Sequence, residues 1–176
     1  ADNCEFGPSA FSNAKLQSIE FQGCAKFGQS ALAKMKYISE IEFPECMTEI
    51  PAGFCKGWSI LEKVRFKNNK VVKILAEAFM DCPKLGGELD LSKLDDLVEI
   101  GDKAFMNTPV NSIKWPSGEF TLGNCAFQKC YLTEVIIPKN VYSIGEKCFQ
   151  GNPALSSVKF EKRTDDRVLS IGSRCF

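Results

Sequence analysis

Residues 130–149 read CYLTEVIIPKNVYSIGEKCF, and the spacing of the apolar residues in this stretch decides the fold. Leu132, Val135 and Ile137 follow the pattern L-x-x-I-x-I, whose last two positions alternate as they do in a strand that is buried on one face. Residues 144–149 follow a second pattern, apolar-Gly-x-x-small-Phe. Both patterns recur along the chain, so an internal repeat is the first hypothesis to test.

The second pattern occurs eight times, with successive anchor residues 21 to 27 positions apart. An apolar residue stands five positions before nearly every anchor and is usually followed by glycine, although Ile50 lies one position closer to its anchor. The glycine predicts a tight turn, for which a positive φ is one option. Before each anchor stands a small residue, Ala, Gly or Cys. The predicted anchors are Phe11, Leu32, Phe54, Phe79, Phe105, Phe127, Phe149 and Phe176.

The first pattern follows the anchors and predicts one short strand in each unit. Its second position is always Ile, Val or Leu, and its third is bulky throughout. A unit this short cannot bury its own apolar positions, whereas stacked units turn each position into a continuous column. The phenylalanine column is the expected internal spine. We therefore predict one repeat domain over residues 1–176, of about seven to eight units.

Residues 130–149 resemble the BspA-like, or treponemal-type, leucine-rich repeat, roughly C-x-x-L-x-x-I-x-I-P-x-x-V-x-x-I-G-x-x-A-F. The resemblance extends over the whole chain, with departures at Leu32, Cys148 and Cys175. It implies a leucine-rich repeat solenoid: a right-handed coil with a parallel β-sheet on the concave side and short helical turns or strands on the convex side. It also implies a secreted or cell-surface protein whose repeats serve adhesion to host proteins or to other cells.

Composition narrows the classes of function. The 22 basic and 22 acidic residues balance, which gives no support to nucleic-acid binding or to attachment at an anionic membrane. The chain has no His, so it lacks every His-based catalytic triad and every His-ligated metal site. No apolar run is long enough to cross a membrane. We expect no enzymatic activity, no cofactor and no metal.

Nine cysteines show no C-x-x-C pair and no zinc spacing. Five of them occupy repeat columns and are predicted to be buried, free packing residues: Cys24, Cys82, Cys130, Cys148 and Cys175. The other four are Cys4, Cys46, Cys55 and Cys125, among which one pair could be oxidised. The cysteines therefore leave the redox compartment open.

The remaining candidate site is the exposed side of the predicted strands. Adjacent strands lie about 4.8 Å apart, so charged residues between the core positions should form a ladder of alternating sign. Two interpretations stay open: a solubilising row of surface ion pairs, or a protein-binding face. The predicted binding residues are Glu40, Glu42, Lys63, Arg65, Lys67, Asp90 and Lys114.

The prediction for function is a non-enzymatic module that recognises a protein on a host or another cell through its concave face. The alternative is a structural spacer that holds other domains apart or packs within a larger assembly. We expect the chain to be part of a longer array, since neither end resembles a polar cap. The partner and the oligomeric state stay open.

Overall fold

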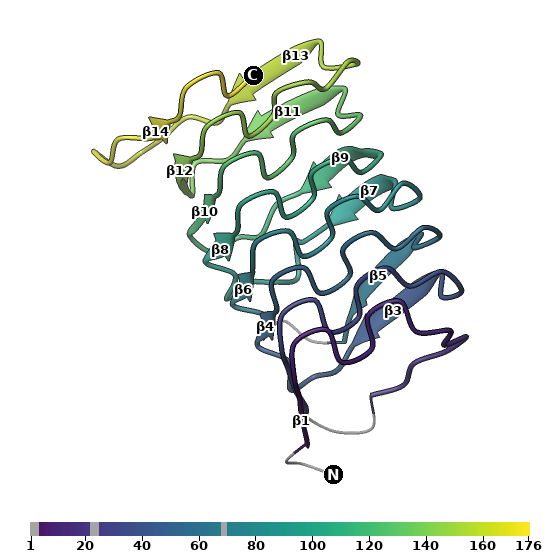
Figure 1. The fold of residues 1–176 in the computed structure, drawn as a ribbon. Coiled ribbons are helices and arrows are strands. Elements are labelled where there is room, and N and C mark those ends of the chain that lie inside the picture. The colour runs from purple at the N-terminus through teal and green to yellow at the C-terminus, as the bar shows by residue number, and fades with distance from the viewer. Residues whose placement is uncertain (1–3, 22–24, 68–69) are drawn as a thin grey trace.

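The computed structural model describes residues 4–21, 25–67 and 70–176, which wind into about seven turns of a parallel-strand solenoid (Figure 1). Its regular elements are fourteen short strands, and the described residues contain no helix. The strands are β1 (Cys4–Phe6), β2 (Ala25–Phe27), β3 (Glu40–Phe43), β4 (Glu49–Ile50), β5 (Lys63–Phe66), β6 (Lys73–Ile74), β7 (Gly87–Asp90), β8 (Glu99–Ile100), β9 (Val110–Lys114), β10 (Phe120–Leu122), β11 (Glu134–Ile137), β12 (Val141–Ile144), β13 (Ser157–Phe160) and β14 (Ser170–Ile171).

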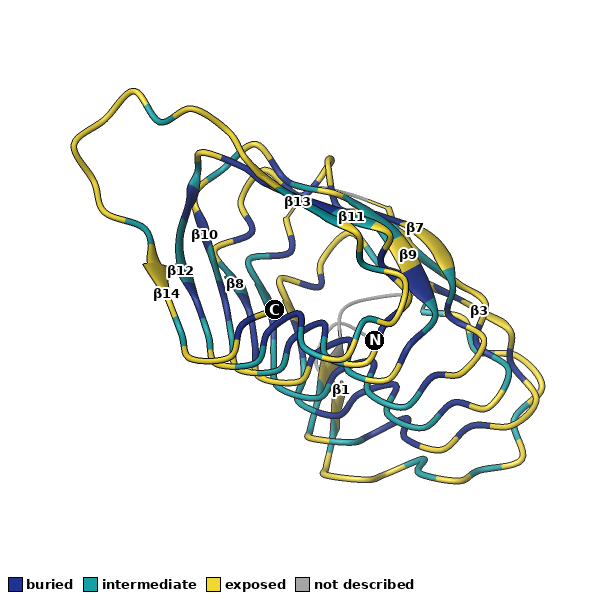
Figure 2. Ribbon diagram, turned by 90° about the horizontal axis from the view of Figure 1, so that it is seen from above, coloured by how far each residue is buried: buried dark blue, intermediate teal, exposed yellow. Residues whose placement is uncertain are grey.

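The even-numbered strands from β4 to β14 form one continuous parallel sheet along one side of the solenoid (Figure 1). The apolar residue that begins the second pattern is in register from coil to coil, so that Ile74 pairs with Ile50 on one side and Ile100 on the other. All three side chains are fully buried. The sheet therefore fixes the spacing of the coils and supplies one wall of the core (Figure 2).

The odd-numbered strands from β3 to β13 come from the L-x-x-I-x-F pattern and lie on the other side of each coil. The sequence predicted one parallel sheet from them. They pair only two at a time instead, as β3–β5, β7–β9 and β11–β13. The solenoid fold predicted from the repeat is confirmed, but the continuous sheet belongs to the other column of strands; of the two options of short helical turns or strands, the described residues form strands.

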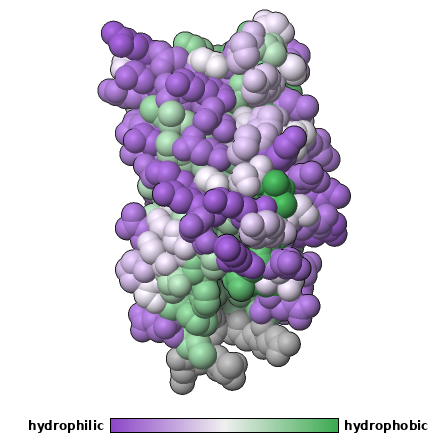
Figure 3. Space-filling model, turned by 45° about the vertical axis from the view of Figure 1, so that its right-hand side comes forward, coloured by the Kyte–Doolittle hydropathy of each residue, from purple (hydrophilic) through white to green (hydrophobic). Residues whose placement is uncertain are grey.

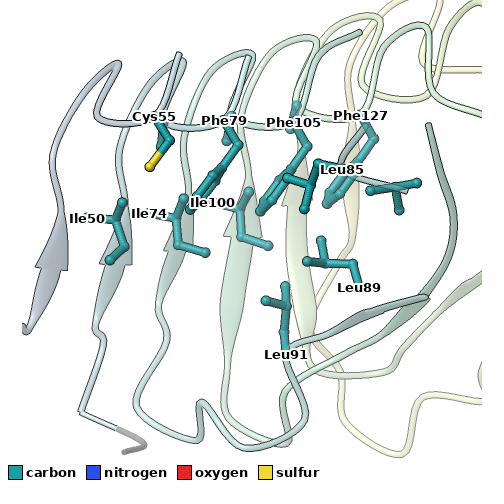
Figure 4. Packing of buried hydrophobic residues seen from close by; sticks show 14 of the residues in the cluster. Ile50, Cys55, Ile74, Phe79, Leu85, Leu89, Leu91, Ile100, Phe105 and Phe127 are labelled. Carbon is teal, nitrogen blue, oxygen red and sulfur yellow. The ribbon is translucent and has the colours of Figure 1, made fainter. Parts of the chain in front are cut away.

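The phenylalanine column is a stack of parallel rings inside the solenoid (Figure 4). Phe105 lies 5.1 Å from Phe79 and 5.3 Å from Phe127, measured between ring centroids, with interplanar angles of 13° and 4°. Phe149 and Phe176 continue the stack at 5.8 and 5.5 Å. The predicted spine is therefore present over the last five anchors.

One of the predicted anchors, Phe54, is wrong. Cys55, not Phe54, lies in line with Phe79 and the later rings (Figure 4). The backbone N–H of Cys55 donates to the carbonyl of Ala78, as the N–H of Phe79 does to Ala104. Ile50 therefore keeps the usual spacing of five to the true anchor, and Phe54 occupies the column that holds small residues elsewhere.

Most repeat glycines lie close against the preceding coil, and the option of a positive φ is wrong for them. A Cβ atom on Gly123 would lie 2.5 Å from the backbone nitrogen of Asp102, and one on Gly145 would lie 2.5 Å from that of Asn124. Positive φ occurs two positions before and two after the anchor, as at Lys103 (57°) and Asn107 (62°) around Phe105. At these two positions a side chain would collide with the backbone of the preceding coil, so glycine is required there.

Side chains three positions after the anchor bind carbonyl groups of the preceding coil. The Sγ of Cys82 donates to the carbonyl of Cys55 at 3.1 Å, and the Sγ of Cys130 donates to that of Phe105 at 3.2 Å. The amide of Asn152 donates to the carbonyl of Phe127 at 2.9 Å. Burial raises the pKa of the Cys82 thiol to about 12, so this cysteine is an unreactive packing residue.

The other cysteines correct one prediction. Cys82, Cys130, Cys148 and Cys175 are buried and free, as expected of packing residues, whereas Cys24 lies outside the described residues. Cys46 is disulfide-bonded, but Cys4, Cys55 and Cys125 are free thiols. No pair therefore forms among those four residues, although one was an open option. Cys55 fails as a candidate because it is an anchor, with its side chain in the core.

Candidate functional site

The predicted binding residues lie together on one side of the solenoid. Glu40 and Glu42 come from β3, and Lys63 and Arg65 come from β5, with Lys67 directly after it. Asp90 is on β7 and Lys114 is on β9. Alternation along each strand turns these side chains toward solvent, and all seven are exposed. We call the exposed side of β3, β5, β7 and β9 the charged face.

The basic and acidic side chains of β3 and β5 pair with one another. The register places Glu42 beside Arg65, as the predicted ladder requires. Two of the three ion pairs run diagonally, however: Arg65 lies 3.2 Å from Glu40, and Lys67 lies 3.3 Å from Glu42. Lys63 is 3.7 Å from Glu40. Each distance joins a side-chain nitrogen to a carboxylate oxygen, and the long side chains can reach the neighbour one step along the strand.

On β7 and β9, Lys114 lies 2.7 Å from Glu88 and 4.0 Å from Asp90. The hydrogen bond to Glu88 raises the pKa of Lys114, and two hydrogen bonds from Ser92 lower the pKa of Asp90. Glu88 was missed by the sequence reading. The signal was the alternation around Leu89: Glu88 directly precedes this inward residue, as Lys63 precedes Val64, and therefore lies on the charged face.

A groove separates β5 from β7, because these neighbouring strands do not pair. Its volume is about 390 Å³. The rim carries Glu62, Lys63 and Arg65 on the β5 side and Glu88 and Asp90 on the β7 side, while apolar side chains form the floor. The apolar floor residues are Val64, Phe66, Leu85, Leu89 and Val110. Figure 3 brings this side of the molecule forward and shows hydrophilic surface over most of it, with smaller hydrophobic areas between.

The predicted charge ladder is interrupted at this groove. The ion pairs of the described residues on this side join β3 to β5, β7 to β9, and Glu134 to Lys159 on β11 and β13, but none joins β5 to β7. A mainly basic rim, with Lys63 and Arg65 beside Glu62, therefore faces an acidic rim, and no ion pair of the described residues joins the two. Such an arrangement leaves charges of both signs available to a ligand that lies between the rims.

A second hollow of about 380 Å³ lies on the turns between consecutive coils. Asp81 and Asn107 line it and are joined by a 2.9 Å hydrogen bond from the Asn107 amide. Tyr131 borders it with 56% of its surface exposed. Within the described ranges, no group of three or more His, Cys, Asp or Glu side chains could hold a metal ion, and no helix could span a membrane.

The repeat columns and the geometry agree with a known family model. The description of that model is "BspA type Leucine rich repeat region", and six copies of it match residues 3–86 and 95–176. The chain belongs to the BspA-type leucine-rich repeat family. In this family member the conserved pattern accounts for the core columns, whereas the charged face lies at the positions between them, which the pattern leaves free.

A solved structure supports the same fold. The crystal structure of the pneumococcal vaccine antigen PcpA matches with a TM-score of 0.63 and 20% sequence identity. The match covers 92% of this BspA-type chain and 41% of the PcpA chain, so the present chain corresponds to less than half of that antigen. At this identity the likeness shows the fold alone. A search of the curated proteins finds no match.

Proposed function

We propose that this chain is a non-enzymatic protein-binding and adhesion module of a secreted or cell-surface protein. Leucine-rich repeat domains generally mediate protein interactions. Recognition takes place on the charged face, around the groove between β5 and β7. The partner is a protein on the surface of a host or of another cell. The observation that carries the proposal is the groove itself, which presents both signs of charge above an apolar floor.

The ion pairs of the charged face contribute little to the stability of the fold. The side chains of Arg65 and Lys114 are 58% and 54% exposed, and solvent screens exposed pairs of this kind so that they add little to stability. The fold therefore does not need this dense arrangement of charge. Charged groups tune the specificity and the rate of protein association, so the dense charge on this face supports a role in protein binding.

The cellular location is proposed from relatives. The matched solved structure is named as a vaccine antigen of a pneumococcus. The resemblance on which the family assignment rests also implies a surface or secreted protein. A protein outside the cell that binds a surface partner is consistent with the exposed, mixed-charge groove.

The alternative is a structural spacer. The described coil nearest the C-terminal end exposes several apolar side chains, among them Phe160 at 55% and Val168 at 85%. Apolar surface of this kind is usually covered by a packing neighbour. In the spacer interpretation the solenoid contributes length and packing contacts, and the charged face binds nothing.

Charge reversal separates the two functions. Proteins captured from host-cell surface extracts by the parent chain would be compared with those captured by the double variant Arg65→Glu/Lys114→Glu. The matched control is Lys73→Glu/Lys103→Glu, which reverses two lysines that are also in ion pairs but lie outside the charged face. We expect the first double variant to lose the captured partner and the control to keep it.

The same partner would then be measured against the parent at two salt concentrations. The reversal should weaken binding and reduce its dependence on salt, because the removed attractions are electrostatic. Equal binding of the parent and the Arg65→Glu/Lys114→Glu variant, with both folded, would remove the charged face as the site and favour the spacer.

A further inference from the structure

The register of the odd-numbered strands determines which backbone groups face the groove. The N–H of Lys63 donates to Ser39, and that of Lys67 donates to Phe43, so alternate residues of β5 point toward β3. In a parallel strand the intervening residues direct both N–H and C=O to the opposite side. The backbone groups of Val64 and Phe66 therefore face β7.

The same alternation applies across the groove. The N–H of Leu91 donates to the carbonyl of Lys114 at 2.9 Å, which places Leu91 and Leu89 on the side of β7 that pairs with β9. Glu88 and Asp90 then direct their backbone groups toward β5. Two open strand edges thus face each other, each with its own row of hydrogen-bonding groups.

The next junction between strand pairs is not open in this way. Between β9 and β11, the N–H of Tyr131 donates to Val110 at 2.9 Å, and that of Thr133 donates to Asn111 at 3.4 Å. No backbone hydrogen bond of the described residues joins β5 to β7. Of the two junctions between the described strand pairs on this side, β5–β7 is therefore the one that combines a groove, an apolar floor and two unpaired edges.

We propose that the β5–β7 groove binds a short extended segment of a partner protein, which adds to the open edges as an extra strand. This proposal rests on the proposed function and specifies the form of the ligand. The backbone of the segment pairs with the open edges, and its inward side chain contacts the apolar floor at Val64 and Phe66. Its outward side chains lie between the basic and acidic rims.

The dimensions of the site agree with such a ligand. Strands β5 and β7 each contain four residues, so about four residues of an extended segment can pair along them, over about 13 Å. The groove volume of about 390 Å³ is at the lower end of the range for ligand sites, which suits a narrow peptide rather than a folded domain.

Proline substitution tests the backbone pairing directly. Val64→Pro removes an N–H that points into the groove, and proline is tolerated where the N–H of an edge strand has no ladder partner. Val158 is the matched control: it occupies the same column, is half-buried like Val64, and directs its N–H away from β11. Val64→Thr keeps the N–H and approximates the side-chain shape.

The probe is a phage-displayed library of short linear peptides, selected on the parent chain, with the strongest binder then synthesised. We expect Val64→Pro to weaken its binding by about tenfold or more, which corresponds to one lost hydrogen bond and an unpaired carbonyl. Val158→Pro and Val64→Thr should bind within about twofold of the parent. The peptide should also slow hydrogen exchange at the Val64 and Phe66 amides of the parent by at least about tenfold.

Three results would overturn the proposal: a library that yields no binder, unchanged binding to Val64→Pro, or no added protection of the two amides. The last measurement uses the parent alone and so does not depend on the folding of a variant. If the Arg65→Glu/Lys114→Glu variant loses its captured protein while these tests fail, protein recognition stands and strand addition is wrong. If neither that variant nor Val64→Pro affects capture, both proposals fail.

Discussion

Truncation of one ring in the middle of the spine should destabilise the solenoid strongly. Phe105 is 1% exposed and is stacked between Phe79 at 5.1 Å and Phe127 at 5.3 Å. Phe→Ala in a core costs about 3–5 kcal/mol, through lost transfer free energy and the cavity that remains. The neighbouring column contains Ala104 and Ala126, which are too small to refill the space. We therefore expect Phe105→Ala to lower the free energy of unfolding by about 4 kcal/mol.

The assay is equilibrium unfolding in guanidinium chloride, followed by far-ultraviolet circular dichroism, with the slopes of the two transitions compared. Phe176→Ala is the control, since Phe176 is 46% exposed and, among the described rings, stacks on that of Phe149 alone. It should cost about 1–2 kcal/mol, because roughly half of its apolar surface is already in water. A loss below about 1 kcal/mol for Phe105→Ala, or equal losses at both positions, would refute the stacked spine.

Three other predictions follow from local geometry. Gly123→Ala should lower the free energy of unfolding by about 1–3 kcal/mol, because its Cβ would meet the backbone of the preceding coil. The control Gly7→Ala, with open space around it, should cost less than about 0.5 kcal/mol. Equal costs of the two substitutions would contradict the close approach of the coils. Denatured, unreduced protein should titrate with at least seven free thiols. In the folded protein Cys148 should react far more slowly with a thiol reagent, because burial raises the pKa of that thiol. A count below five would contradict the packing role. A pH titration monitored by nuclear magnetic resonance should give Asp90 a pKa below its ordinary value of 3.8, because Ser92 donates two hydrogen bonds to the carboxylate. The small contribution of this group to stability is then present above the unfolded pKa and is lost as the pH falls through the depressed folded pKa. An unshifted midpoint would contradict those hydrogen bonds.

The fold could be predicted from the sequence because each repeat column is restricted to few residue types by a packing requirement. The rings of the spine must stack, and Gly123 must have no side chain, so these positions tolerate few residue types. The error at Phe54 has the same origin. Counting from the most conspicuous residue type selected a phenylalanine, whereas counting five from Ile50 selects Cys55, which the hydrogen bonds of the backbone identify as the anchor.

The candidate site could be predicted only in part. Alternation in the strands was enough to place Arg65 and Lys114 on the exposed side. The partner of Arg65 could not be predicted, since a long side chain chooses between Glu40 and Glu42 by small differences in reach. The groove was also missed. Its position depends on which strands pair through backbone hydrogen bonds, and the pattern of side chains along the sequence does not show this pairing.

The position of the groove follows from how the coils are held together. Along the even-numbered strands the sheet is continuous, and around the anchors each coil also bonds to the next, as Phe79 does to Ala104 and Phe105 does to Ala126. Two sides of every coil are thus fixed at one spacing. Differences in repeat length must be absorbed on the third side, and the insertions near residues 67–70, 91–96 and 162–167 all follow an odd-numbered strand. The unpaired β5–β7 junction lies on that side, where a change in loop length can open or close a groove without disturbing the spine.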